Sequence, residues 1–284
     1  MKNYRSFEIV LADQVATIQM LPLAKAFALQ PPADIHVELA SVLEELRADN
    51  YVRAIVLTGA EDGVFLSTPP VDYYRTPQSA ARLGDPFGMW NVGTGVIRCF
   101  QVMTEIEKPI VAKVNGDAIG FGQSLMFGSD LIIAREDARI SDVHMGMGEV
   151  VASDGTHVGL PFGTAPGDGA GSLISLFMPP TKAKEYMMLG ETYSAKELAD
   201  MNIINRAVPM ADLTRTTDEI LNRLLKRSAF ALAWTKRILN RHVAHQMNLA
   251  LDASVAYEAL NFAHIQRLGH EGDPRTLHRP DQKT

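Results

Sequence analysis

The chain is poor in cysteine, in net positive charge and in long apolar runs, and each shortage excludes a class of protein. Cys99 is the only cysteine among 284 residues, so no disulfide can form within the chain, as is usual in a reducing compartment. The net charge of −6 argues against nucleic-acid binding, which needs a basic surface. No stretch approaches the roughly 18 apolar residues of a membrane span, and the first residues lead into a strand-like pattern instead of a secretory signal. We therefore expect a cytoplasmic protein with no nucleic-acid or membrane partner.

The apolar residues that are present occur in short runs, as in a soluble α/β protein. Residues 53–59, 109–114 and 131–134 have the pattern of buried parallel strands. Helical spacing between these runs indicates right-handed crossovers and a largely parallel sheet. Residues 7–20 alternate in two patches, which predicts a hairpin near the N-terminus.

Helical patterns flank these strands and fill the C-terminal part of the chain. Asp34 stands where an N-cap is expected, before a helix that carries Leu39 and Leu43 on its apolar face. Residues 69–90 and 142–171 are rich in turn-forming residues, and we expect both to be loops, the second around the active site. Further helices are predicted near residues 92–106, 182–189, 194–200, 210–227, 229–241 and 246–268.

Five collinear segments carry a resemblance to a known family. The central three are Lys-Pro-Ile-Val-Ala-Lys-Val-Asn-Gly at 108–116, Ile-Gly-Phe-Gly at 119–122 and Ser-Asp-Leu-Ile-Ile-Ala at 129–134. Residues 55–67 upstream and 183–209 downstream fit in order and spacing. Together the segments resemble the crotonase (enoyl-CoA hydratase/isomerase) superfamily, and their order is more specific than any single motif.

The resemblance implies an architecture and a substrate class. The fold class would be α/β, with a crotonase-like spiral of ββα units over residues 1–209 and a C-terminal helical trimerisation region over residues 210–284. The substrate would be an acyl-CoA, so CoA enters as part of the substrate, with no separate cofactor and no metal. The implied assembly is a homotrimer or a dimer of trimers.

Glycines around residue 121 predict a site that stabilises an oxyanion. Such a site needs donors that are oriented before negative charge develops, and backbone N–H groups at a helix N-terminus supply them. Gly120 and Gly122 would open such a helix and let a substrate approach closely. By resemblance, the two donors are the N–H groups of Phe121 and Ser67.

The acid–base residues depart from the common family pattern. Hydratases of the family commonly use two glutamates, and the first of these positions corresponds to Ser124, which cannot act as a carboxylate base. The loop that follows offers Asp168 as the first candidate, with His144 and His157 as alternatives for a catalytic histidine. Gly167 belongs to a Gly-Asp-Gly turn that resembles a branch of the family containing β-diketone hydrolases.

Three functions remain open from the sequence. The first is an acyl-CoA enzyme that stabilises a thioester enolate, by hydration or isomerisation. The second is a β-diketone C–C hydrolase of the retro-Claisen type, with His144 or His157 as base and Asp168 as its partner or acid. The third is a non-catalytic crotonase-fold binding protein, which the missing glutamate suggests. The small-molecule partner is accordingly an acyl-CoA or a diketone.

Other polar residues have ordinary structural interpretations. Asp154 lies in an Asp-Gly turn. Glu258 is expected on a helix surface or at a subunit contact, although diketone hydrolases carry a glutamate in a similar place. Lys236 and Arg237 fit a solvated helix face or a contact with CoA phosphates.

Overall fold

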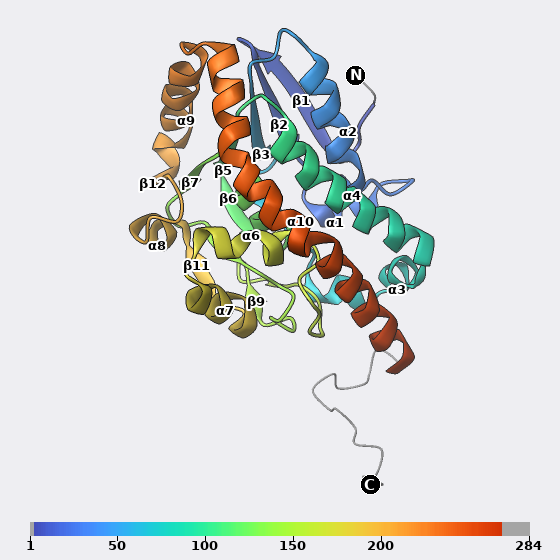
Figure 1. Cartoon of the computed structure of the whole chain (residues 1–284). Helices are drawn as coiled ribbons and strands as arrows, with labels where there is room; N and C mark the ends of the chain where they lie inside the picture. Colours follow the sequence, from blue (N-terminus) through green and yellow to red (C-terminus); the bar gives the residue numbers. More distant parts are fainter. Residues whose placement is uncertain (1–2, 269–284) are drawn as a thin grey trace, which may run out of the picture.

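Two large sheets, a small two-stranded sheet (β10-β9) and a layer of helices make up the part of the chain that the structure, a computed structural model, describes (residues 3–268; Figure 1). The first sheet has six strands in the order β1-β2-β3-β5-β7-β12, and the second has four in the order β11-β8-β6-β4. The pairs from β2 to β12 are parallel, and β1 is antiparallel to β2. The strands are β1 Phe7–Ala12, β2 Val15–Met20, β3 Ala54–Gly59, β4 Gly63–Ser67, β5 Ile110–Val114, β6 Gly116–Ile119, β7 Leu131–Arg135, β8 Arg139–Ser141, β9 Val150–Val151, β10 His157–Val158, β11 Thr192–Ser194 and β12 Arg206–Val208.

Successive strands alternate between the two sheets. The pairs β3/β4, β5/β6 and β7/β8 each give their first strand to the six-stranded sheet and their second to the four-stranded sheet. Asn115 makes one of these breaks, because its side chain accepts a hydrogen bond from the N–H of Gly59 (2.9 Å) and donates to the carbonyl of Glu61 (2.7 Å). Repeated strand pairs followed by helices confirm the predicted spiral of ββα units.

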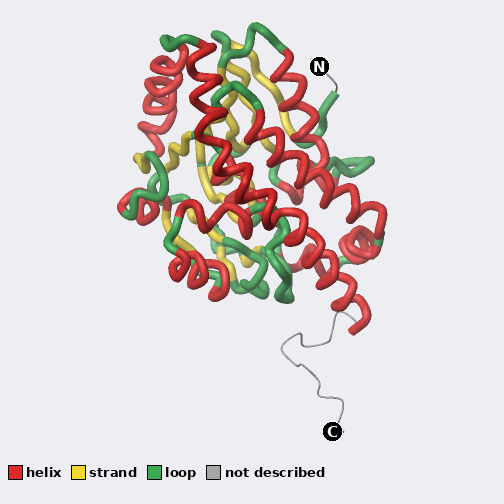
Figure 2. The backbone as a smooth tube through the Cα atoms, viewed as in Figure 1, coloured by secondary structure: helices red, strands yellow, loops and turns green. Residues whose placement is uncertain are grey.

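Helices cover the sheets and close the core (Figure 2). The helix α2 packs against α4, and the long α10 lies across α4 and α6. The helix α9 covers the six-stranded sheet at β3, β5 and β7. The helices are α1 Leu23–Ala28, α2 Ile35–Ala48, η1 Val71–Arg75, α3 Pro77–Gly84, α4 Pro86–Glu105, α5 Phe121–Gly128, α6 Ala170–Phe177, α7 Pro180–Leu189, α8 Ala195–Asp200, α9 Met210–Leu225 and α10 Ala229–Leu268.

Several helix boundaries follow from capping residues. Asp34 is the N-cap of α2, as predicted, and its carboxylate accepts from the N–H of His36 at 3.0 Å. Thr76 and Asp85 cap α3 and α4 in the same way, each followed by a proline at the first helical position. The prediction of a loop over residues 69–90 was therefore wrong, because its prolines begin helices instead of interrupting them.

Two further expectations need correction. Residues 229–268 form one continuous helix instead of two, because nothing between residues 241 and 246 breaks helical geometry. The predicted loop 142–171 contains the short hairpin β9–β10, and α6 already begins at Ala170. The proposed division at residue 209 stays a prediction.

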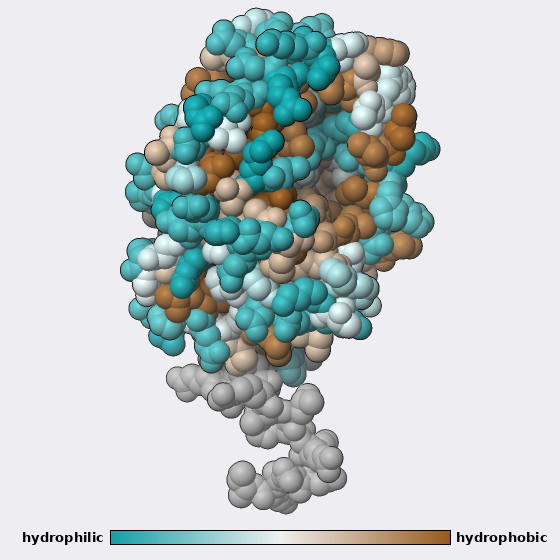
Figure 3. Space-filling model, turned by 90° about the vertical axis from the view of Figure 1, so that its left-hand side faces the viewer, coloured by the Kyte–Doolittle hydropathy of each residue, from teal (hydrophilic) through white to brown (hydrophobic). Residues whose placement is uncertain are grey.

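The surface carries apolar patches among hydrophilic residues, as one face shows (Figure 3). The first half of α10 exposes Phe230, Trp234, Ile238 and Leu239, with exposed fractions of 49–73%. Exposed apolar groups of this kind often mark protein contacts. The predicted trimer stays a prediction. Within residues 3–268, no helix combines the length and apolar character that a bilayer crossing requires.

Truncation of a core residue should test the packing between α2 and α4. We expect Leu43→Ala to lower the free energy of unfolding by about 2–5 kcal/mol, because Leu43 is fully buried and its loss leaves a cavity. Val37→Ala on the same helix should change it by less than about 0.5 kcal/mol, since Val37 is 42% exposed. Urea denaturation measures both values, and equal effects would contradict the observed helix orientation.

Candidate active site

A buried aspartate–histidine pair lies where strand β8 ends. Nδ1 of His144 is 3.0 Å from both carboxylate oxygens of Asp142, and the N–H of His144 donates to Oδ1 at 2.9 Å. Nε2 of Gln123 donates to Oδ2 of Asp142 at 3.0 Å, and the hydroxyl of Tyr186 donates to Oε1 of Gln123 at 2.8 Å. This chain of bonds fixes the Asp142 carboxylate, which can only accept, so Nδ1 of His144 carries a proton.

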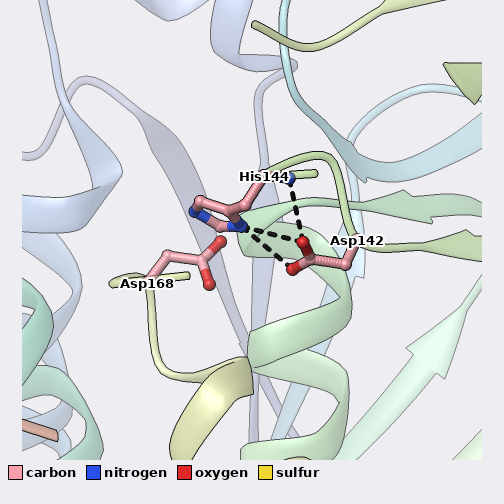
Figure 4. Close-up of side chains that lie close together, drawn as sticks. All are labelled: Asp142, His144 and Asp168. Carbon is pink, nitrogen blue, oxygen red and sulfur yellow. Dashed lines mark hydrogen bonds and ion pairs between the residues drawn. The ribbon is translucent and has the colours of Figure 1, made fainter. Parts of the chain in front are cut away.

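Asp168 reaches the same place from the turn before α6. The hydroxyl of Ser124 donates to Oδ1 of Asp168 at 2.8 Å. Gly169, the next residue, has φ +106°, and a Cβ there would lie 2.2 Å from the ring of Phe100. Only glycine fits this turn, which aims the carboxylate. In Figure 4, Asp142 and Asp168 both point toward the imidazole of His144.

Glu258 completes the cluster from helix α10. Its Oε1 lies 3.3 Å from Nε2 of His144, and the close approach of Gly167 to the Glu258 side chain requires a glycine there. The interpretation of Glu258 as a helix-surface or intersubunit residue was therefore wrong. His144 lies between two carboxylates, one at each ring nitrogen.

Burial and the charges in the cluster shift the pKa values of His144 and Asp168. Burial by itself lowers the pKa of His144, but Asp142 and Asp168 outweigh it and raise this pKa well above 6.5. Burial raises the pKa of Asp168 above 3.8, with Asp142 and Glu258 adding to the shift and His144 opposing it. The neighbouring carboxylates thus favour the protonated form of His144, and burial favours the protonated form of Asp168.

The cluster opens into an apolar cavity of about 130 Å³. His144, Asp168 and Glu258 form part of its wall, and aliphatic and aromatic side chains from α1, α4, α10 and the η1–α3 segment form most of the rest. A few polar groups in an apolar cavity are the usual composition of a small-molecule site.

Of the two predicted oxyanion donors, Phe121 lines this cavity and Ser67 does not, although the next residue, Thr68, does. Phe121 lines the cavity and begins α5, whose N-cap is Gly120 with φ +65°. Thr68, which also lines the cavity, donates its N–H to the carbonyl of Ile119 at 3.2 Å, so the N–H of Ser67 points to the other side of this edge strand. Gly122 permits α5 to approach β4, because a Cβ would lie 1.9 Å from the carbonyl oxygen of Leu66. The donor roles of Ser67 and Phe121 remain predictions.

The hairpin β9–β10 holds the other candidate histidine away from the cluster. His157 is exposed, and its Nδ1 lies 3.1 Å from the carbonyl oxygen of Gly148. It does not line the cavity described above. Asp154 accepts from the N–H of Thr156 at 2.8 Å, as expected for a turn residue. Of the two histidines, the structure therefore brings only His144 to Asp168.

Lys236 differs from its expected solvated position. Its Nζ lies 2.6 Å from Oδ2 of Asp130, and the lysine is buried. The carbonyl of Lys108 accepts a second bond at 3.0 Å. Lys236 therefore anchors α10 to the start of β5.

The same cluster offers ligand atoms for a cation. One atom each from Asp142, His144 and Asp168 lie within 4.8 Å of one another. The expectation of no metal stays a prediction: we expect activity to survive dialysis against a chelator, because hydrogen bonds already engage Asp142 and Asp168. Loss of turnover that added Zn²⁺ or Mn²⁺ restores would contradict this expectation.

Comparisons with known proteins fit this architecture. The family profile described as Enoyl-CoA hydratase/isomerase matches residues 12–272. The chain is 26% identical over 230 residues to the short-chain-enoyl-CoA hydratase of Clostridium acetobutylicum. This match covers 81% of this chain and 78% of that protein. It is 24% identical over 248 residues to a hydroxycinnamoyl-CoA hydratase-lyase of Pseudomonas fluorescens, covering 84% and 79%.

Solved structures share the fold. An enoyl-CoA hydratase/isomerase from Mycobacterium paratuberculosis superposes with a TM-score of 0.76 at 23% identity, covering 91% of this chain and 94% of the other. A β-diketone hydrolase from the cyanobacterium Anabaena superposes with a TM-score of 0.75 at 18% identity, covering 93% and 96%. At these identities the likeness establishes the fold, and the reaction has to be argued from the site.

Proposed function

We propose that this chain, an enzyme that belongs to the enoyl-CoA hydratase/isomerase family, hydrolyses a carbon–carbon bond of a β-diketone by a retro-Claisen reaction. The observation that carries the proposal is that Asp168 and His144 lie close together in the wall of one apolar cavity. Ser124 occupies the position where the hydratases of the family commonly have a glutamate. Its hydroxyl donates a hydrogen bond to Asp168. Family membership sets aside the third interpretation of the sequence, a non-catalytic binding protein.

The pKa directions assign a base and an acid. The pKa of Asp168 is raised, so its ionised carboxylate is a stronger base than that of an ordinary aspartate. A pKa closer to neutral pH is what a general base needs. The pKa of His144 is raised well above 6.5, so the imidazolium is available as a general acid. Paired groups with separated pKa values are the usual sign of such a division of roles. This assignment reverses the expectation from the sequence that the histidine would be the base.

The reaction then balances with water as the only co-reactant. Asp168 takes a proton from water while the water oxygen bonds to one carbonyl carbon of the diketone. The resulting alkoxide is stabilised by the backbone N–H groups of Ser67 and Phe121. When the alkoxide collapses, the bond to the central carbon breaks and its electron pair forms the enolate of the second carbonyl. His144 protonates the central carbon, the proton on Asp168 returns to His144, and a carboxylic acid and a ketone leave.

Hydration of an acyl-CoA is the second candidate. The same pair would add water across a double bond, with Asp168 removing the proton and His144 protonating the enolate of the thioester. Its support is the similarity to the Clostridium acetobutylicum hydratase, at 26% identity, and to the hydratase-lyase. CoA would again be part of the substrate, and no separate cofactor is proposed. A cytoplasmic location and a trimeric assembly remain proposals as well.

The two candidates separate in one experiment. Wild-type enzyme is given cyclic and linear 1,3-diketones in oxygen-18 water, and in parallel crotonyl-CoA, with loss of the enoyl-thioester absorbance as the second readout. Retro-Claisen cleavage places one heavy oxygen atom in the released carboxylate. His157→Gln is the control, because His157 is exposed and does not line the cavity.

The outcomes point in different directions. Labelled carboxylate from a diketone, lost in His144→Gln and kept in His157→Gln, supports the proposal. Turnover of crotonyl-CoA with inert diketones replaces it by hydration. Equal loss in both histidine variants would contradict the site as placed here.

A further inference from the structure

A second aspartate–histidine pair lies beside the same cavity, and its histidine, His36, forms part of the cavity wall. Oδ1 of Asp34 is 2.6 Å from Nδ1 of His36, so the spacing Asp-x-His of the first cluster recurs at the start of α2. The Asp34 carboxylate also caps this helix through the N–H of His36. The imidazole lies against the ring of Phe121, with 4.1 Å between ring centroids. His36 is therefore held beside the residue that begins the predicted oxyanion turn.

Arg82 joins this second pair from helix α3. Its Nη2 donates to Oδ2 of Asp34, and its guanidinium lies over the ring of Phe27 at 3.9 Å. Burial by itself raises the pKa of Asp34, but His36 and Arg82 outweigh it and lower this pKa well below its usual range. Both Asp34 oxygens are thus occupied, one by His36 and one by Arg82.

Both side chains have nitrogen atoms that the first pair of bonds leaves open. His36 and Arg82 line the cavity. Within residues 3–268, Nε2 of His36 and Nη1 and Nε of Arg82 make no hydrogen bond to a side chain or backbone group. A guanidinium carries five N–H donors, and its fork matches a carboxylate. The remaining guanidinium donors of Arg82 fit an anionic group with two oxygens better than a single carbonyl.

The two clusters differ in charge. Around His144 stand Asp142, Asp168 and Glu258, whereas Asp34 alone faces His36 and Arg82. Tyr74, which also lines the cavity, is close enough to both clusters for the charges of Arg82 and Glu258 to act on its hydroxyl. A negatively charged substrate group would be repelled by the three carboxylates and attracted to Arg82, which would set the direction in which a substrate lies.

We propose that Arg82, with His36 beside it, binds a carboxylate of the substrate, so that the substrate class is a β-diketone bearing a carboxylate on its apolar part. The substrate class rests on the proposed reaction, while the anion site rests on the Asp34–His36–Arg82 geometry. Asp34 is a positioning residue that orients both side chains. When the substrate carboxylate is bound at Arg82, the reacting carbonyl of the substrate faces His144 and Asp168.

Binding of a matched pair of unreactive ligands tests the site without turnover. Cyclohexylacetate and its neutral amide are titrated calorimetrically into the wild type and into Arg82→Gln, Arg82→Lys and His36→Gln. We expect the wild type to bind the carboxylate at least tenfold more tightly than the amide. Arg82→Gln should remove this preference, Arg82→Lys should keep part of it, and His36→Gln should reduce it. Arg75→Gln is the matched control, because Arg75 lies in the adjacent η1 segment, pairs with Asp72 on the surface and does not line the cavity.

A further variant separates this proposal from the proposed reaction. His144→Gln should abolish turnover and retain the preference for the carboxylate. The anion site is overturned if the wild type does not prefer the carboxylate, or if Arg82→Gln keeps the preference, whatever the enzyme cleaves. A preference for the carboxylate without any diketone cleavage overturns the reaction alone.

Discussion

Asp168→Asn is expected to lower kcat by about 100- to 10,000-fold, the range for loss of a general base, and to change KM little. Asparagine keeps the size of the side chain and still accepts the bond from Ser124. It cannot take a proton from water. Steady-state kinetics at neutral pH, on whichever substrate the wild type turns over, measures the loss.

Two variants control for this result. Asp154→Asn alters an exposed aspartate in a turn of the same loop and should leave kcat unchanged. Ser124→Ala removes a bond that lowers the pKa of Asp168, so the acidic limb of the pH profile should move to higher pH. Near-wild-type activity of Asp168→Asn would remove Asp168 from the catalytic machinery.

The fold could be predicted from the sequence because its signals are local. Buried strands such as β3, β5 and β7 show as short apolar runs, and the turn between β1 and β2 shows as a break in alternation. The helix α3 and the first residues of α4 were missed because prolines were taken for loop formers, although Thr76 and Asp85 before them are good N-caps. The short strands β9 and β10 leave almost no periodicity, since each has two residues.

The site could be predicted only in part, because its members come from distant segments. Asp168 and His144 were candidates, since they lie in one loop of unusual composition. Glu258 reaches His144 from α10 across 114 positions of sequence (258 minus 144), and no local pattern marks it as a neighbour. Helical spacing places Glu258 on a face but does not say what packs there.

The His36 cluster was missed for a related reason. The Asp-x-His spacing at residues 34–36 matches that at 142–144, a likeness that the sequence contains. The sequence pattern explained Asp34 as an N-cap. Its second role, binding Nδ1 of His36 and Nη2 of Arg82 with its two carboxylate oxygens, is visible only in the structure. Arg82 lay in a segment expected to be a loop, where nothing indicated which way it faced.

Asp142→Asn should shift the basic limb of the pH–rate profile. Burial alone lowers the pKa of His144, and Asp142 is the largest of the groups that raise it. Without that charge the pKa of His144 should fall, because a close opposite charge favours the protonated imidazole. A general acid with a raised pKa stays protonated until the pH rises through that pKa. The variant should therefore lose activity at a lower pH than the wild type, and kcat at neutral pH should fall by about 100-fold or more, since both charge and orientation of the imidazole change.

The comparison with Glu258→Gln makes this argument specific to Asp142. Glu258 contributes less to the raised pKa of His144, so its variant should move the basic limb less than Asp142→Asn does. Both variants should leave the acidic limb in place or move it to lower pH, because Asp142 and Glu258 each raise the pKa of Asp168. Profiles of kcat against pH for the three proteins distinguish the roles. If Asp142→Asn lost activity while its basic limb stayed at the wild-type position, His144 would not be the acid, and the charge that Asp142 supplies would serve only to hold the fold of the loop.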